Sequence, residues 1–210
     1  MKQILTLSLA LISCQLQAHQ LHYRHKKAPG EFGSHITALI AAVIHTNGPV
    51  LELGCGWGST PQLHAICAQH QRKLVSTDTS LEWLTKFSKV LSTDWHEFIY
   101  VPVYENDWDI NPKPYLWDEI GTDTHWSVVL IDHRPGERRK DDLLRFKDQA
   151  EIIVVHDTEV NGRCGYTNVQ SEYGLEPIFE QFKYRVDFDR FNPLTTIVSN
   201  SIDVSKIFAE

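Results

Sequence analysis

The sequence has few cysteines and no long run of basic residues, and both absences restrict what the protein can be. Its 210 residues include four cysteines, which form no C-x-x-C pair (Cys14, Cys55, Cys67 and Cys164). We therefore expect mostly free thiols rather than a structural zinc site or a disulfide-rich fold. The net charge is −7, and no basic cluster is longer than Arg138-Arg139-Lys140. Because binding to a nucleic-acid backbone needs a cationic surface, we expect no nucleic-acid partner.

No transmembrane span is expected, because the apolar stretch over residues 4–13 is too short to cross a bilayer. It follows Met1-Lys2 and precedes polar residues, which is the pattern of a signal peptide with Ala18 as a cleavage point. Residues 11–14 also resemble a bacterial lipoprotein box, in which Cys14 would carry the lipid. This interpretation predicts a periplasmic, secreted or lumenal protein. The alternative is a retained N-terminal helix on a cytoplasmic protein.

The chain divides into a signal-like segment (residues 1–18), a polar linker (residues 19–33) and one domain (residues 34–210). The linker holds three histidines at intervals of three residues, but no carboxylate or cysteine joins them. A solvated linker is therefore favoured over a metal-binding tract. The domain opens with Ser34, which is expected to cap a helix with one apolar face (Ile36, Ile40, Val43 and Ile44).

Strand and helix patterns alternate from Val50 onward, which predicts an α/β fold. The expected architecture is a three-layer, Rossmann-like, doubly wound sheet that is mostly parallel and ends in an antiparallel hairpin. Three strands are almost wholly apolar, as expected when both faces of a sheet are buried. The predicted strands cover residues 49–53, 73–77, 97–103, 126–131, 151–155, 184–188 and 195–199. The predicted helices cover residues 61–70, 138–146 and about 176–182, and a fourth starts with a capping box at Thr79.

A glycine-rich loop follows the first strand and is the most informative part of the sequence. Gly54, Gly56 and Gly58 alternate with other residues, and Thr60-Pro61 then opens a helix. Glycine lets the backbone turn sharply and lie against a ligand, and the N–H groups of the helix start face the same loop. Asp78 ends the second strand, where a carboxylate can accept both hydroxyls of a ribose. The competing interpretation is that Asp78 caps a helix or a turn.

The segment Glu52-x-Gly54-x-Gly56-x-Gly58 resembles motif I, E/D-x-G-x-G-x-G, of the class I S-adenosylmethionine-dependent methyltransferases. The resemblance covers nearly the whole domain, since acids also follow the second, fourth and fifth strands. It implies S-adenosyl-L-methionine as cofactor, with Glu52 near the amino-acid end and the three glycines against the ligand. It also implies that Asp107 and Trp108 lie near the adenine. A dinucleotide-binding oxidoreductase would have the spacing G-x-G-x-x-G, and it remains an alternative.

Candidate catalytic residues follow the fourth and fifth strands, whose carboxyl ends are expected to be adjacent. The pattern of Asp132, His133 and Asp157 resembles the catechol-type metal-dependent O-methyltransferases, which implies Mg²⁺ held by Asp132 and Asp157. Two positions depart from that family: Thr158 replaces an amide, and Pro135 falls near the position of a lysine base. His133 is the favoured base over His156. The competing interpretations are that the two aspartates cap helices or turns and that the histidines are ordinary core residues.

These observations predict transfer of a methyl group to an oxygen on a small molecule or a glycan. One alternative is an exported or lipid-anchored protein that keeps this fold without catalysis. The other is an NAD(P)-binding oxidoreductase. The acceptor and the oligomeric state are not readable from the sequence.

Overall fold

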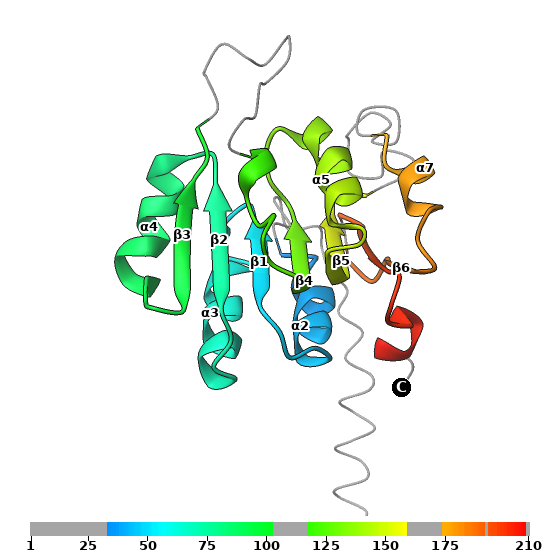
Figure 1. The fold of residues 1–210 in the computed structure, drawn as a ribbon, viewed down its shortest axis with the longest axis horizontal. Helices are drawn as coiled ribbons and strands as arrows, with labels where there is room; N and C mark the ends of the chain where they lie inside the picture. Colours follow the sequence, from blue (N-terminus) through cyan, green and yellow to red (C-terminus); the bar gives the residue numbers. More distant parts are fainter. Residues whose placement is uncertain (1–32, 103–116, 159–173, 192, 209–210) are drawn as a thin grey trace, which may run out of the picture. The chain divides into compact units, whose positions relative to one another are not determined.

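A seven-stranded sheet forms the centre of the computed structural model, with the strand order β3-β2-β1-β4-β5-β7-β6 (Figure 1). The structure describes residues 33–102, 117–158, 174–191 and 193–208. The strands are β1 (Val50–Leu53), β2 (Leu74–Asp78), β3 (His96–Tyr100), β4 (Trp126–Ile131), β5 (Ala150–His156), β6 (Tyr184–Phe188) and β7 (Thr195–Ser199). β1 to β5 pair in parallel, and β7 is antiparallel to both β5 and β6. This is the Rossmann order 3-2-1-4-5-6 with one antiparallel strand inserted.

Helices cover both faces of the sheet and make a three-layer architecture. α2 (Ile36–Ile44) and α3 (Thr60–Gln69) pack with one side of the strands, which we call the α2/α3 face. α5 (Arg139–Phe146) and α7 (Glu176–Phe179) pack with the other side, the α5/α7 face. The remaining helical elements are α4 (Leu81–Leu91), η1 (Trp117–Glu119), η2 (Gly136–Arg138) and η3 (Val204–Ile207). The predicted fold class is therefore confirmed.

The predicted hairpin is also confirmed, but its second strand lies next to the parallel part of the sheet. β7 pairs with β5, and β6 forms the edge. All residues of β1, β4 and β7 are buried. In β1 and β4 this burial explains why the sequence is nearly continuous in apolar residues instead of alternating, whereas β7 also buries Thr195, Thr196 and Ser199. The third strand is shorter than predicted, ending at Tyr100.

The start of α2 differs from the prediction in a way that affects the site. The helix buries Ala38, Leu39, Ala42 and Val43 against the sheet, whereas Ile44 is 61% exposed. The predicted apolar face was wrong except at Val43, because two alanines let the helix backbone approach the sheet closely. Ser34 does not cap this helix. Its hydroxyl lies 2.7 Å from Nε2 of His156 at the end of β5.

Two other predicted helix starts give mixed results. Thr60 is the first residue of α3 rather than its cap. The predicted cap Thr79 was wrong by one residue: Ser80 caps α4, and its hydroxyl accepts a hydrogen bond from the N–H of Trp83 at 3.2 Å. Both helices nevertheless begin within a residue or two of the predicted positions, because proline and serine mark helix N-termini by local chemistry.

Several sequence predictions lie outside the described residues. These are the signal-like segment, the linker, Cys14, Cys164, Asp107 and Trp108. From Phe32 onward the chain forms one compact unit. Within the described ranges, no helix combines the length and the apolar character needed to cross a membrane. Cys55 and Cys67 are buried, unpaired thiols.

Candidate active site

The glycine loop lies where the strand order reverses, between β1 and β4. Gly54 has φ +101°, and a Cβ there would lie 2.5 Å from the carbonyl oxygen of Asp132. Glycine is therefore required at position 54, because the β1 loop touches the backbone after β4. Gly56 is different, since the atom nearest to a Cβ at that position would be Oγ of Ser59, at 3.7 Å. A Cβ at Gly56 would meet only ordinary van der Waals contacts, so the backbone is less crowded there than at Gly54.

Asp78 links this loop to the start of α4. Its Oδ2 accepts a hydrogen bond from the N–H of Cys55 at 2.9 Å, and its Oδ1 accepts one from the N–H of Ser80 at 2.7 Å. Burial raises the pKa of Asp78 above the usual value. The backbone N–H of Thr79 also hydrogen-bonds to this carboxylate, whose four lone pairs leave an acceptor position after these three contacts. The carboxylate at the end of β2 is thus compatible with a ribose hydroxyl.

Glu52 is fully buried beneath the loop. Its Oε2 accepts a hydrogen bond from the hydroxyl of Ser76 at 2.5 Å, and its Oε1 accepts one from the hydroxyl of Thr60 at 3.0 Å. The N–H of Gly56 donates in turn to the Thr60 hydroxyl at 2.9 Å. Burial raises the pKa of Glu52 to about 7. Glu52 therefore reaches the loop through Thr60 and supports it from inside the protein.

Two histidines extend this network away from the loop. Nε2 of His96 lies 2.9 Å from the Ser76 hydroxyl, and Nδ1 of His96 lies 2.9 Å from Nδ1 of His64 on α3. Burial, together with the neighbouring imidazole, lowers the pKa of His96 to about 3. If both rings are neutral, one proton arrangement satisfies every contact. His64 then donates to His96, His96 donates to Ser76, and Ser76 donates to an ionised Glu52.

A second cluster lies at the ends of β4 and β5. Asp132 and Asp157 come together there, with side chains that are 22% and 23% exposed. Arg139 bridges them, since Nη2 lies 3.1 Å from Oδ1 of Asp132 and Nη1 lies 3.1 Å from Oδ2 of Asp157. The same guanidinium donates to the carbonyls of His133 and His156. A guanidinium thus joins the two carboxylates that the sequence analysis assigned to Mg²⁺.

His156 belongs to this cluster. Its Nδ1 lies 3.0 Å from Oδ1 of Asp132 and 3.6 Å from Oδ1 of Asp157. Burial alone would lower the pKa of His156, but the charge and hydrogen bond of Asp132 outweigh it and raise the pKa. Burial would likewise raise the pKa of Asp132, but His156 and Arg139 lower it overall.

His35, which sequence reasoning did not single out, completes the cluster. It precedes α2, and its ring packs edge-on against that of His156 with centroids 4.5 Å apart. Nδ1 of His35 lies 4.0 Å from Oδ2 of Asp132, and only 2% of the residue is exposed. Burial lowers the pKa of His35 to about 4, so the imidazole is neutral at physiological pH. No local sequence signal identifies His35, because its neighbours lie about 100 residues or more away in the chain.

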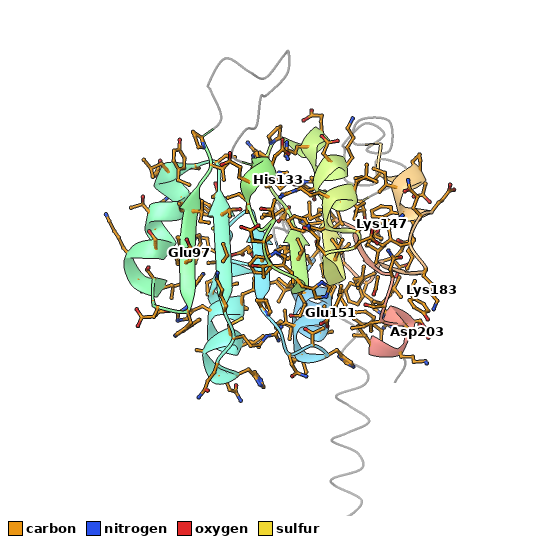
Figure 2. All side chains as sticks on the ribbon, in the orientation of Figure 1. Glu97, His133, Lys147, Glu151, Lys183 and Asp203 are labelled. Carbon is orange, nitrogen blue, oxygen red and sulfur yellow. The ribbon has the colours of Figure 1, made fainter. Side chains whose placement is uncertain are left out.

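His133 lies on the opposite side of the sheet from His156. Its Nε2 lies 2.8 Å from Oδ2 of Asp142 on α5, and its ring packs on Trp117 at 4.4 Å. Asp142 also accepts hydrogen bonds from Arg138 and Arg145. Figure 2 labels His133 at the end of the sheet to which the arrows of the parallel strands point. The structure therefore does not bring the side chain of this predicted base to Asp132 and Asp157, but buries it in a network of charged residues.

No protein-family model and no curated protein matches the chain. Solved structures do resemble it. A cofactor-bound structure of Rv0187 from MTB has a TM-score of 0.56 at 13% identity, covering 91% of this chain and 90% of that one. The MTase domain of METTL16 has a TM-score of 0.50 at 10% identity, covering 80% and 67%. This chain has the class I methyltransferase fold.

A third similar structure contains a bound ligand. It is spermidine synthase in complex with the transition-state analogue AdoDATO, with a TM-score of 0.51 at 13% identity. The match covers 83% of this chain, which spans only 61% of that enzyme. At these identities the comparisons establish the methyltransferase fold alone, and the chemistry has to be argued from the residues.

The site of this methyltransferase fold suits an adenosyl amino acid. In the described part of the chain, no hydrogen bond engages the backbone N–H groups of Trp57 and Gly58, which lie directly before α3. The nitrogen of Gly58 lies 3.9 Å from the position of a Cβ at Gly56, and Asp78 accepts from the N–H of Cys55 in the same loop. Backbone donors at a helix N-terminus bind carboxylates, and a carboxylate such as Asp78 binds hydroxyls. The donors and acceptors of the loop therefore fit the carboxylate and the ribose of S-adenosylmethionine.

Proposed function

We propose that the chain is an S-adenosylmethionine-dependent methyltransferase that methylates an oxygen on a small molecule or a glycan. One observation carries this proposal. The loop at Gly54 touches the backbone of Asp132, so the expected cofactor site and the partly exposed acids of the second cluster share one edge of the sheet. A methyl donor and an acceptor bound at these two places would be neighbours, as an in-line displacement requires.

The residues of the loop would hold the cofactor. When bound, S-adenosylmethionine supplies an electrophilic methyl group. Asp78 would accept a ribose hydroxyl through its remaining acceptor position, and Gly56 would allow close approach to the backbone. Glu52 would act indirectly, by holding Thr60 and through it the N–H of Gly56.

The acids at the ends of β4 and β5 would serve the acceptor. Methyl transfer forms a carbon–oxygen bond and breaks the carbon–sulfur bond of the donor, and the acceptor's proton must go to a base. Asp132 and Asp157 are the partly exposed members of their cluster, so they would orient the acceptor hydroxyl. Asp157 would take its proton, because His156 and Arg139 lower the pKa of Asp132 and make it a weaker base. Arg139 keeps both carboxylates in fixed positions.

The class of acceptor follows from charge. A net charge of −7 disfavours a nucleic-acid acceptor and is compatible with a small molecule or a glycan. Glycans are included because the signal-like start suggests export to a compartment in which glycans occur. That the protein is exported is therefore part of what we propose.

The cofactor assignment is tested by ligand binding. S-adenosylhomocysteine should raise the melting temperature of the full chain, whereas NAD(H) should not. Asp78→Asn should weaken S-adenosylhomocysteine binding by about tenfold or more, because one hydroxyl loses its carboxylate oxygen. Glu97→Gln, on the exposed side of β3 (Figure 2), is the matched control and should bind normally. Stabilisation by NAD(H) alone would favour the oxidoreductase.

Catalysis is tested separately, with labelled S-adenosylmethionine and a panel of metabolites and glycans. Asp132→Asn should bind S-adenosylhomocysteine like the wild-type chain and lose turnover. A wild-type chain that binds the cofactor but methylates nothing in the panel would support the non-catalytic alternative.

A further inference from the structure

The strongest unexplained feature outside the proposed cofactor site is His35. It is 2% exposed, and neither of its ring nitrogens has a hydrogen-bond partner among the described residues. Thr195, whose hydroxyl is likewise buried without a partner there, pairs across the sheet with His156. Buried polar atoms without partners are costly and rare in folded proteins. Among the described residues, His35 is the only side chain with two such atoms, and both ring nitrogens are available to a ligand.

The groups that face His35 are ligands for metal ions. One nitrogen from His35, one oxygen from Asp132 and one nitrogen from His156 all lie within 4.8 Å of one another. The three residues come from the start of α2, the end of β4 and the end of β5. Small side-chain adjustments would bring these atoms to a single ion, since zinc ligands lie about 2.0–2.2 Å from the metal.

The surrounding contacts orient these ligands. In the metal-free protein the Nδ1–H of His156 donates to Oδ1 of Asp132 at 3.0 Å, and Nε2 lies 2.7 Å from the Ser34 hydroxyl. A bound ion would replace the Nδ1 proton, and the Ser34 hydroxyl would accept a hydrogen bond from Nε2–H. Such a hydrogen bond on the outer nitrogen is the usual support of a metal-binding histidine. Arg139 and His156 occupy Oδ1 of Asp132, while Oδ2 lies on the side of His35 at 4.0 Å from its Nδ1.

The local charge also favours a cation. Asp132 and Asp157 carry two negative charges, and Arg139 supplies one positive charge. A metal ion bound at Nδ1 of His156 replaces the proton at that nitrogen, and the side chains of the cluster would then carry one uncompensated negative charge. A divalent ion next to Asp132 would offset it.

We propose that His35, Asp132 and His156 bind a first-row transition-metal ion, for which Zn²⁺ is the appropriate probe. Two imidazoles and one carboxylate are a donor set that suits zinc and its neighbours, whereas Mg²⁺ prefers oxygen ligands. The site differs from the Mg²⁺ pair of the sequence analysis, because Asp157 contributes no ligand to it. Three protein ligands leave a coordination position open. The proposal concerns metal binding and does not depend on methyl transfer.

The test is a Zn²⁺ titration of the full chain after chelator treatment, read with a competing chromophoric chelator. We expect one Zn²⁺ per chain, undisturbed by millimolar Mg²⁺. His35→Gln and Asp132→Asn should each weaken binding by about 100-fold or more. His45→Gln, an exposed histidine at the other end of α2, is the matched control and should leave the affinity unchanged.

The linker histidines need their own control. A chain with His19, His22 and His25 all changed to Gln should keep the Zn²⁺ affinity. Loss of binding in that variant would overturn the proposal, because the ion would then belong to the linker. Unchanged affinity in folded His35→Gln, checked by circular dichroism, would overturn it too.

A spectroscopic measurement that leaves the cluster unaltered keeps the proposal testable if the variants at the cluster unfold. Co²⁺ added to the metal-free chain with the three linker histidines replaced should give visible ligand-field bands of a nitrogen and oxygen site. Zn²⁺ should abolish these bands at one equivalent. A chain that shows no such bands under these conditions would rule the site out.

Discussion

Two of the buried polar clusters described above contain similar residues but differ in how many of their polar atoms have hydrogen-bond partners. In the network of Glu52, Ser76, His96 and His64, one proton arrangement gives every contact a donor and an acceptor. In the cluster of His35, Asp132 and His156, ring nitrogens of His35 stay without partners in the described residues. The first cluster is complete as a support for the glycine loop. The second is complete only with a further group bound.

The comparison teaches that burial and perturbed acidity do not by themselves identify a functional site. Glu52 and His96 have strongly shifted pKa values because burial disfavours their charged forms. Their contacts nevertheless leave no direct position for a ligand. His35 has a similarly lowered pKa, but its unpaired nitrogens face a carboxylate. Unsatisfied hydrogen-bonding capacity is therefore the more informative signal.

The largest expected effect is at Gly54, where the two regions touch. Gly54→Ala should destabilise the protein by about 4 kcal/mol, because alanine is strained at φ +101° and its Cβ would overlap the Asp132 carbonyl. Urea denaturation measures this change. Gly56→Ala is the control: it should cost at most about 1 kcal/mol, yet weaken S-adenosylhomocysteine binding by placing a methyl group in the proposed cofactor site. Equal destabilisation by the two variants would contradict the assignment of distinct roles.

The second effect tests the completeness of the Glu52 network through pH. The pKa of Glu52 is about 7 in the folded protein against 4.5 for the free side chain, so the folded state binds the proton more tightly. Stability from this group is therefore fully present below about pH 4.5 and falls as pH rises towards 7, by roughly 3 kcal/mol in total.

Glu52→Gln should remove this pH-dependent part of the unfolding free energy, because glutamine does not titrate. The difference in unfolding free energy between wild type and variant, measured by urea denaturation from pH 4.5 to 8, should shift in favour of the variant as pH rises. A difference that stays constant over this range would mean that Glu52 titrates normally.

The third prediction concerns the incomplete cluster. His35→Leu should stabilise the metal-free protein by about 2 kcal/mol, because it replaces two unpaired buried nitrogens with apolar atoms of similar volume. Thermal or urea denaturation in the presence of a chelator measures the change. Ser76→Ala serves as the contrast, since removing a partner from the complete network should destabilise the protein. A destabilised His35→Leu would indicate that His35 has partners that the described residues do not include.

The smallest effect is expected at the outer end of the complete network. His64→Ala should cost about 1 kcal/mol, because His96 loses one hydrogen bond while the contacts around Glu52 remain. His70→Ala, an exposed histidine just after α3, should be neutral. A large loss of stability in His64→Ala would show that the network depends on its surface end.

Much of the fold could be predicted because its signals are local. Continuous apolar strands, helix starts at Pro61 and Ser80 and the glycine loop each depend on a few neighbouring residues. The position of Glu52 was harder to interpret. It falls within β1 in register with Ser76, and both side chains are buried. The residue pattern of the loop suggested contact with a ligand, whereas strand geometry directs this side chain into the protein.

The histidines show what strand geometry alone can decide. Asp132 and His133 follow β4 as neighbours, and neighbouring residues of an extended chain point to opposite sides of a sheet. His133 accordingly meets Asp142 on the α5/α7 face, while Asp132 meets His156. The ranking of His133 above His156 rested on distance from the strand end and did not use this alternation.

The sequence by itself determined the order of strands and helices, the glycine-rich turn and the acids at the strand ends, because these depend on residues close together in the chain. Only the tertiary structure decided that Arg139 bridges Asp132 and Asp157 and that His35 faces His156. It also decided that β7 lies between β5 and β6 in the sheet. Those contacts join segments separated by up to 121 positions, from residue 35 to residue 156. They depend on how helices pack on a sheet, which no short stretch of sequence encodes.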